Sequence, residues 1–563
     1  MFWFQVGIAL AAQLLGAQAV ASTSPVYVQV QSASFLGLHN ATLGIESFRG
    51  VRYGHAERFR KAVPVSYSEP ATINASFFGV ACPQIKGTNA LAADYGIYGT
   101  DEDCTLLDIY RPAGTNSSSR LPVMLWLHGG ALTQGAASHY PADALVAESI
   151  KLDLPVIAIS INYRLALWGF LCVISCQLCD RHTHPPLRGG REAAKNGALN
   201  LGLYDQVAAL EWVQKYIEAF GGDKDKVTVF GQSSGAMSIA YHYLKEDTKL
   251  FRAAILQSGG STSVPAMVPE KYQNVYNRLA SITGCDAAAN SFECLRTFNQ
   301  TLLLDYVNVI FADSTNYSGR PWGVAIDGDV IPDSPSRLTA LGRIARIPFI
   351  SGNVHDEGTV FVKPRELNTT DDFLTFLNRD YVNRNATFFG NLTSVNKLLK
   401  LYPANPSLGS PFDTGSETFW GPQFKRAAAA YGDLHFQGPR RHWLDVAVWK
   451  GIPSWSYDFD QIIPGTSAWQ GVYHTTEIDY VFVQFEPSAG ADYELARQTL
   501  AYWLSFATRL DPNYHGNPVW LPYGRTAKEK RTLHLEAGNV KMIPDDYRRK
   551  QTEYVHLRFR EDI

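Results

Sequence analysis

The sequence predicts an α/β protein with a large, mostly parallel central sheet, because short apolar runs alternate with helical periodicity along the chain. Five runs have the character of buried strands, and each ends where polar or glycine residues begin. They cover residues 122–130, 155–164, 227–235, 253–260 and 347–353. Nearly unbroken apolar strands indicate a sheet covered on both faces, as in parallel α/β architecture.

The segment 200–223 is expected to form a helix that packs on this sheet. Its apolar residues recur at helical spacing, at Leu203, Val207, Leu210 and Ile217. Gly221 and Gly222 follow and end the helix. Strand, helix and strand therefore form the repeating unit of the fold.

Composition and charge describe an ordinary globular protein. Of the 563 residues, 46% are hydrophobic and 18% are charged. The net charge of −3 provides no electrostatic reason to expect nucleic acid or an anionic membrane as a partner. Length alone suggests several domains, but a large α/β sheet with long insertions favours a single domain over residues 22–563.

The first residues form an apolar run that ends in small residues, which is typical of a secretory signal peptide. Cleavage after Ala21 predicts a signal peptide over residues 1–21 and a secreted, extracellular protein. The charged C-terminal segment 555–563 predicts neither a lipid-anchor signal nor a final membrane span.

Asparagine sequons support a secreted protein, because N-x-[ST] marks possible glycosylation in that compartment. Eight such candidates occur, at Asn40, Asn74, Asn116, Asn299, Asn316, Asn368, Asn385 and Asn391. This number predicts a glycosylated surface.

A candidate nucleophile lies in Gly231-Gln232-Ser233-Ser234-Gly235, directly after an expected strand and before an expected helix at 236–244. In this context G-x-S-x-G predicts a nucleophile elbow, whereas the alternative is a tight turn that contains serine by chance. The two glycines relieve crowding in the turn. Ser233 would then lie above a helix N-terminus, whose dipole favours developing negative charge.

The run from Phe220 to Gly235 resembles the active-serine motif of type-B carboxylesterases and lipases, which are relatives of the cholinesterases. Further similar segments are FRGVRYG at 48–54, DEDCTLLDIYRP at 101–112, NYRLALWGFL at 162–171, NLGLYDQ at 200–206, HDEG at 355–358 and GVYHTTEIDYVF at 471–482. The resemblance extends from about residue 25 to 510 and is strongest to secreted fungal members. It implies an α/β-hydrolase fold with long insertions.

A serine nucleophile requires a base and an orienting carboxylate, which follow it in the chain order Ser, Asp or Glu, then His in this fold. Glu357 lies where similar esterases carry their triad acid, and its neighbour Asp356 is the chemical rival. Among fourteen histidines, His474 matches the family's base. The predicted catalytic residues are thus Ser233, Glu357 and His474.

The tetrahedral oxyanion requires hydrogen-bond donors, and an apolar strand followed by His128-Gly129-Gly130-Ala131 resembles the family's oxyanion loop. The resemblance implies donors from the backbone N–H groups of Gly130, Ala131 and Ser234. Many relatives have glycine where Ala131 stands. The alternative is an ordinary glycine turn.

The resemblance also implies two disulfide bonds, Cys82–Cys104 and Cys285–Cys294. In cholinesterases the first loop carries a tryptophan that stacks on the choline cation, but here it contains Tyr95 and Tyr98 and no tryptophan. Gln232 replaces the glutamate that many relatives place before the serine. Both differences weaken the attraction for a cation, which argues against a cholinesterase.

Segment 172–191 does not match the resemblance, because it separates two segments that nearly adjoin in similar esterases. It contains C-x3-C-x2-C followed by H-x-H. Three interpretations remain open: translation of a retained intron, a surface insertion, and a zinc site.

The residues and the resemblance together predict a secreted serine carboxylesterase that requires no metal or organic cofactor. Its partner would be a small-molecule or lipid ester, with no nucleic acid and no stable membrane anchor. A triacylglycerol or sterol-ester lipase is the alternative enzyme, but the short 82–104 loop favours soluble esters. A cholinesterase-like binding protein without catalysis is the alternative from another class. The sequence predicts neither the acyl and alcohol preference nor the oligomeric state.

Overall fold

The computed structural model describes residues 23–85, 99–171, 190–266, 273–312, 321–362, 367–381 and 391–558. Several expectations fall outside these described residues. They concern the signal peptide, nearly all of segment 172–191, Tyr95, Tyr98, Asn316 and Asn385.

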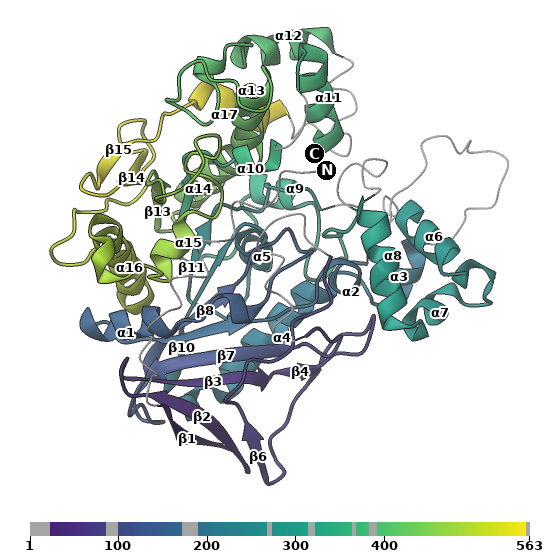
Figure 1. Cartoon of the computed structure of the whole chain (residues 1–563), viewed down its shortest axis with the longest axis vertical. Coiled ribbons are helices and arrows are strands. Elements are labelled where there is room, and N and C mark those ends of the chain that lie inside the picture. Colours follow the sequence, from purple (N-terminus) through teal and green to yellow (C-terminus); the bar gives the residue numbers. More distant parts are fainter. Residues whose placement is uncertain are drawn as a thin grey trace.

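A 13-stranded sheet forms the centre of the protein (Figure 1). Its strand order is β1-β2-β3-β7-β9-β8-β10-β11-β12-β13-β14-β15, and β6 pairs with β2 beside this path. The strands are β1 (Thr23–Val30), β2 (Ala33–Asn40), β3 (Ile45–Arg52), β6 (Ala71–Asn74), β7 (Leu106–Pro112), β8 (Leu121–Leu127), β9 (Ile157–Ile161), β10 (Gly222–Gln232), β11 (Ala253–Gln257), β12 (Phe349–Val354), β13 (Ser454–Phe459), β14 (Arg531–Leu535) and β15 (Lys541–Pro544). Separately, β4 (Gly54–His55) pairs with β5 (Val63–Pro64).

The five expected strands become β8 to β12, so the prediction of an α/β fold with a parallel sheet is confirmed for this region. The sheet is parallel from β9 through β14 in spatial order. It is antiparallel among β1, β2, β3, β7 and β9 and again between β14 and β15. These antiparallel edges were not predicted from the sequence, because β1 and β2 alternate buried and more exposed residues instead of forming unbroken apolar runs.

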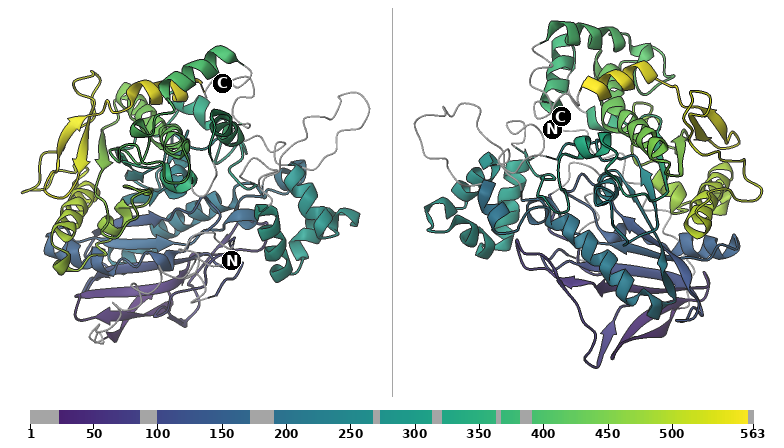
Figure 2. Two further views of the ribbon diagram at one scale, coloured as in Figure 1. Left: turned by 45° about the horizontal axis from the view of Figure 1, so that its top comes forward. Right: turned by 180° about the vertical axis from the view of Figure 1, so that it is seen from behind.

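Helices flank both faces of the sheet, as predicted (Figure 2). They are α1 (Asp143–Lys151), α2 (Ala166–Gly169), α3 (Gly190–Lys195), α4 (Leu201–Tyr216), α5 (Ser234–His242), α6 (Gln273–Ile282), α7 (Ser291–Thr297), α8 (Gln300–Ala312), α9 (Pro335–Ala340), α10 (Thr359–Val362), α11 (Thr370–Tyr381), α12 (Leu392–Leu401), α13 (Phe424–Gly432), α14 (Gly438–Lys450), α15 (Glu477–Val481), α16 (Ala491–Arg509) and α17 (Arg549–Arg558). Figure 2 shows α6, α7 and α8 grouped at the side of the sheet.

Strand β8 illustrates how the sheet separates two apolar cores. Val123, Leu125 and Leu127 belong to the larger core, which also includes residues of α4 and α5. Met124 and Trp126 belong to the core on the other face, with residues of α1 and α16. Alternation along one strand therefore buries apolar area on both faces.

Helix α4 is buried more widely than its apolar stripe predicted. Leu203 and Leu210 are buried as expected, while Val207 is half-buried and the charged Asp205 is completely buried. Asp205 accepts two hydrogen bonds from the Arg164 guanidinium, at 2.8 Å from Nε and 2.7 Å from Nη2. The pair ties α4 to the segment after β9.

Two disulfide bonds join Cys82 to Cys104 and Cys285 to Cys294. These are the pairs that the resemblance implied. Each closes a loop and so reduces the conformational freedom of the unfolded chain.

The surface leaves room for glycans at the described sequons. Asn40 is half-buried, and the exposed asparagines are Asn74, Asn116, Asn299, Asn368 and Asn391. Glycosylation itself stays a prediction. Among the helices of the described residues, none has both the length and the apolar character needed to cross a membrane.

Removing the carboxylate of Asp205 should strongly destabilise the fold. We expect Asp205→Ala to lower the free energy of unfolding by about 3–5 kcal/mol, because Arg164 stays buried without its counter-charge. The control is Arg343→Ala, which removes the exposed Arg343–Glu246 pair and should cost less than about 1 kcal/mol. Urea unfolding followed by tryptophan fluorescence measures both, and equal losses would contradict the assigned role of the buried pair.

Candidate active site

The candidate nucleophile lies in a sharp turn between β10 and α5. β10 ends at Gln232, and Ser233 precedes the first residue of α5 with φ 55° and ψ −124°. Few residues other than glycine adopt a positive φ, so this backbone conformation is strained. The Ser233 N–H donates to the Gln257 carbonyl oxygen at 2.9 Å, which ties the turn to the end of β11.

The elbow glycines are required by a neighbouring strand as well as by the turn. A Cβ atom at Gly235 would lie 2.0 Å from the Leu127 carbonyl oxygen at the end of β8. A Cβ atom at Gly231 would lie 2.7 Å from the same oxygen. The motif therefore allows the elbow to approach the backbone that leads into the candidate oxyanion loop.

That loop lies directly against the nucleophile. A Cβ atom at Gly129 would lie 3.1 Å from the Ser233 Cβ. The Ser234 hydroxyl accepts a hydrogen bond from the Leu132 N–H at 3.2 Å, which fixes the loop to the start of α5. Gly130 has φ 105° and Ala131 has φ 58°, so the backbone turns through two positive-φ residues here.

The three expected oxyanion donors share one property. Among the described residues, the backbone N–H groups of Gly130, Ala131 and Ser234 have no hydrogen-bond acceptor. Ala131 keeps its N–H in a conformation that costs alanine roughly 1–2 kcal/mol more than glycine. The loop therefore offers unpaired donors next to Ser233, as an oxyanion site requires.

The structure brings two of the three predicted catalytic side chains into direct contact. His474 Nδ1 lies 2.5 Å from Glu357 Oε2, and both side chains are buried. The other oxygen of Glu357 accepts from Asn353 Nδ2 at 2.9 Å and from the Val354 N–H at 3.1 Å. A carboxylate held in this way accepts the Nδ1 proton, and the lone pair of His474 is then on Nε2.

Asp356, the chemical rival of Glu357, has a different role in the structure. Its Oδ1 accepts from Ser410 Oγ at 2.7 Å and from the Phe412 N–H at 2.9 Å. Its Oδ2 accepts from the Val472 N–H at 3.0 Å, two residues before His474. Asp356 therefore holds the loops around the histidine, while its neighbour contacts the histidine ring.

No hydrogen bond joins the Ser233 hydroxyl to His474 among the described residues. Instead, His474 Nε2 lies 3.2 Å from Nε2 of Gln232, the residue before Ser233. Because Nε2 of the ring is the acceptor, the Gln232 amide is the donor. From the sequence, Gln232 was expected only to be an uncharged replacement for glutamate. Its contact with His474 was not predicted, although its position beside the candidate nucleophile could have suggested it.

Glu477 is a second residue that the sequence analysis missed. It is 1% exposed, and burial, followed by the charge of Glu357, raises the pKa of its carboxyl to about 8. Gln257 Nε2 donates to its Oε1 at 3.4 Å, but its Oε2 has no partner. No pattern in the sequence marks this burial, because Glu477 begins a short helix, α15, in a polar segment.

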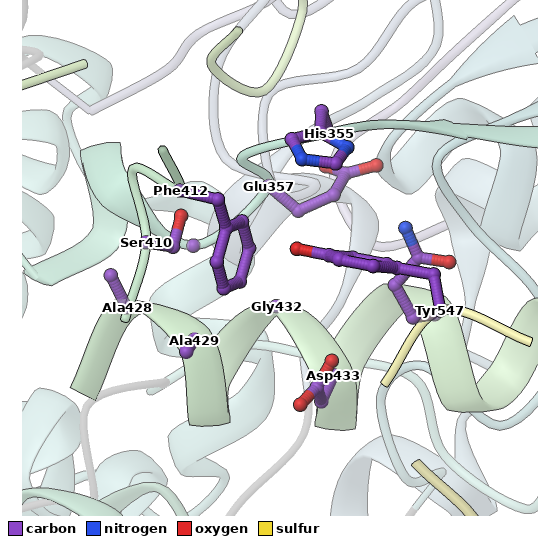
Figure 3. A pocket seen from close by; sticks show the side chains of 11 residues that line it. His355, Glu357, Ser410, Phe412, Ala428, Ala429, Gly432, Asp433 and Tyr547 are labelled. Carbon is purple, nitrogen blue, oxygen red and sulfur yellow. The ribbon is translucent and has the colours of Figure 1, made fainter. Parts of the chain in front are cut away.

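A small pocket lies behind the candidate triad acid (Figure 3). Its walls include His355, Glu357, Phe412 and Tyr547, together with residues of α13. Ser233 does not line this pocket, so it is distinct from the space in which an ester would meet the nucleophile. The His474 ring does not line this pocket and packs against Phe436, with the two ring centroids 4.6 Å apart.

Comparison with known proteins shows which family has this arrangement. A model described as the carboxylesterase family matches residues 24–555. The chain belongs to the carboxylesterase family. It is a carboxylic-ester hydrolase, as the sequence predicted.

The relatives include fungal lipases. The chain is 34% identical to Lipase 2 of Geotrichum candidum over 549 residues, which is 90% of each chain. It is 33% identical to Secreted lipase 1 of Botryotinia fuckeliana, over 95% of this chain and 93% of that relative. The crystal structure of EstA from Aspergillus niger matches with a TM-score of 0.76 at 24% identity and covers 95% of this chain and 99% of that one. This last match shows the shared α/β-hydrolase fold.

Burial of Glu477 predicts a pH-dependent stability. The pKa of Glu477 is raised to about 8 in the folded state, above its unfolded value of 4.5. Its neutral form therefore contributes full stability below pH 4.5, and this contribution is lost as the pH rises towards 8. We expect the apparent Tm of Glu477→Gln minus that of the wild type to increase by roughly 2–4 °C between pH 5 and pH 8 and then to level off.

Differential scanning fluorimetry at a fixed scan rate measures this difference. Other buried acids, such as Asp108 with a pKa raised to about 7 by burial, affect both proteins equally and cancel. A difference that does not change with pH would show that Glu477 ionises normally in the folded protein.

Proposed function

We propose that the chain hydrolyses esters through an acyl-enzyme on Ser233, with His474 as general base and Glu357 as the residue that orients it. The observation that carries this proposal is the 2.5 Å hydrogen bond between His474 Nδ1 and Glu357 Oε2. It selects the tautomer in which Nε2 accepts a proton. The strained elbow presents Ser233 at the same carboxyl edge of the sheet, where α/β enzymes place their reacting groups.

In the first half-reaction, Ser233 Oγ attacks the ester carbonyl carbon while His474 Nε2 takes the hydroxyl proton. The negative charge on the carbonyl oxygen is stabilised by the N–H groups of Gly130, Ala131 and Ser234, and losing one such donor typically costs roughly 3 kcal/mol. The C–O bond to the alcohol then breaks, and His474 transfers the proton to the departing alcohol oxygen. The products are free alcohol and acyl-Ser233.

In the second half-reaction, His474 removes a proton from water as the water oxygen attacks the acyl carbon. The bond to Ser233 breaks, the proton returns to Ser233 Oγ, and the carboxylic acid leaves. Both halves require His474 Nε2 to exchange the Gln232 amide for the Ser233 hydroxyl or for water. Hydrogen bonds of this kind commonly tighten only when substrate binds.

We prefer soluble esters as the substrates, because the 82–104 loop is short for the apolar lid of a lipase. Lipolysis is the second candidate. The names of the relatives in Geotrichum candidum and Botryotinia fuckeliana favour lipolysis. A carboxylesterase-like protein without catalytic activity is disfavoured by the unpaired donors and the His474–Glu357 contact.

Export to the extracellular space is also part of the proposal. The apolar N-terminal segment, the two disulfide bonds and the exposed sequons all fit an oxidising secretory route. One relative is named a secreted lipase.

Covalent labelling tests the nucleophile. We expect a fluorophosphonate probe to label both the wild type and the Ser234→Ala variant. Ser234→Ala keeps the backbone N–H of residue 234, which is the group proposed to bind the oxyanion. Ser233→Ala should lose the label and lower kcat by roughly a millionfold, since the step that forms the acyl-enzyme is removed. Intact-protein mass spectrometry measures the adduct, and a label that persists in Ser233→Ala would refute the assignment.

Whether the substrate is dissolved or emulsified distinguishes esterase activity from lipase activity. We expect p-nitrophenyl esters of short acids to be hydrolysed with a rate that saturates smoothly, and tributyrin hydrolysis to show no break at its solubility limit. Such a profile follows if the site binds dissolved monomers. A sharp rise in rate when tributyrin forms an emulsion, measured by pH-stat titration with Ser233→Ala as the blank, would assign lipase activity instead.

A further inference from the structure

Two histidines and two aspartates gather at the carboxyl ends of β12, β13 and β14, outside the candidate active site. His355 follows β12, Asp458 lies in β13, Asp460 follows β13, and His534 lies in β14. Asp458 and His534 are register partners in adjacent parallel strands, so their side chains leave the same face of the sheet. Asp460 is two residues beyond Asp458 and shares that face.

The donor atoms lie at separations close to those of metal ligands. His355 Nδ1 is 3.6 Å from Asp458 Oδ2 and 4.0 Å from Asp460 Oδ1. His534 Nδ1 is 3.9 Å from Asp460 Oδ2. Tetrahedral zinc with bonds of about 2.0–2.2 Å places its ligands about 3.3–3.6 Å apart. The ligand atoms of His355, Asp458 and Asp460 all lie within 4.8 Å of one another. His534 is close to Asp460, and its ring must move towards the other two residues to become the fourth ligand.

Both imidazoles direct an unpaired ring nitrogen at the carboxylates. Nδ1 of His355 and Nδ1 of His534 are buried without a hydrogen-bond partner. His534 as a whole is only 8% exposed. A nitrogen that is buried in this way beside a carboxylate, yet too distant for a hydrogen bond, requires an explanation.

Glu536 explains the orientation of His534. Its Oε2 lies 3.1 Å from His534 Nε2 and also accepts a hydrogen bond from Asn539 Nδ2 at 2.5 Å. Asn539 Nδ2 also lies 3.5 Å from His534 Nε2, but the contact with the carboxylate is shorter and favours a proton on Nε2. In the neutral ring the Nδ1 lone pair then points towards Asp460. A lone pair facing a carboxylate is repulsive unless the nitrogen is protonated, as in an ion pair, or a metal cation lies between them. A carboxylate behind the ring is the usual support of a metal-binding histidine.

Two aromatic rings hold the His355 imidazole in its orientation. It stacks on Tyr547 with centroids 4.9 Å apart and meets the Phe412 ring edge to face at 5.4 Å. Figure 3 shows His355 beside these two aromatic rings at the wall of the small pocket. This packing limits rotation of the imidazole and keeps Nδ1 on the side of the aspartates.

We propose that His355, Asp458, Asp460 and His534 bind one divalent transition-metal ion of the zinc type. Two imidazole nitrogens and two carboxylate oxygens suit such an ion, whereas Ca²⁺ takes six to eight oxygen ligands. Four protein ligands close the coordination sphere, so the ion is structural and takes no part in ester hydrolysis. It joins the ends of three strands two residues before Glu357 and thereby stabilises the segment that carries the candidate triad acid.

Metal content and thermal stability test the site in the full-length chain, produced without a histidine tag in a secretory host. We expect about one zinc ion per chain by mass spectrometry of the purified protein. Treatment with a chelator should lower the apparent Tm by at least about 5 °C, and added Zn²⁺, but not Ca²⁺ or Mg²⁺, should restore it. A chain without zinc whose Tm does not respond to Zn²⁺ would overturn the proposal and leave His355 as the protonated partner of the two aspartates.

Substitutions locate the ion. We expect His534→Gln and Asp460→Asn to weaken Zn²⁺ binding at least tenfold in calorimetric titration, and Glu536→Gln to weaken it about tenfold or more through the orientation of His534. The matched control is His55→Gln, which removes an exposed histidine lying 3.2 Å from Asp103 and should leave binding unchanged. Circular dichroism verifies that each variant folds. If the two ligand variants keep wild-type affinity, the ion lies elsewhere and the proposal is wrong; if they fail to fold, the wild-type titration and Glu536→Gln still decide it.

Discussion

The close approach of the nucleophile elbow to the end of β8 is the constraint on which the candidate site depends. The Leu127 carbonyl oxygen leaves no space for a side chain at Gly231 or Gly235. Because these two glycines let the backbones meet, Ser233 lies against Gly129, the residue before Gly130 and Ala131, whose N–H groups have no acceptor among the described residues. The proposed nucleophile and the proposed oxyanion donors of the β8 loop thus follow strands that are adjacent in the sheet but about a hundred residues apart in the chain.

Around this contact, buried charged side chains mainly hold neighbouring segments of the chain together. Asp356 and Glu357 are neighbours, yet consecutive side chains leave the backbone in different directions, so one binds the loops and the other binds the His474 ring. Arg164 and Asp205 fasten α4 in the same manner. Glu477 differs, because one of its oxygens has no partner, and its raised pKa keeps it neutral next to the Glu357 carboxylate at neutral pH.

Part of this arrangement could be predicted from the sequence, because it depends on the local pattern of residues. The five buried strands were unbroken apolar runs, and the elbow was a short motif between a strand and a helix. The antiparallel strands β1 and β2 were missed because half-exposed alternation is a weaker signal than continuous apolar runs. The contact of Gln232 with His474 and the burial of Glu477 were missed because both depend on neighbours more than two hundred residues away.

The sequence by itself determined the α/β class and the elbow glycines, since these follow from periodicity and from a short steric motif, whereas the serine, acid and base were predicted from the resemblance. Local pattern did not distinguish the two adjacent acids Asp356 and Glu357, and only the resemblance favoured Glu357. The tertiary structure shows that Glu357 contacts the histidine, because the contact depends on the direction in which each side chain leaves the end of β12. It also decided that His474 contacts Gln232 and not the Ser233 hydroxyl, and that His355, Asp458, Asp460 and His534 converge. Strand register is the physical reason for that convergence, because it brings distant polar residues to one edge of the sheet, and no local pattern encodes it.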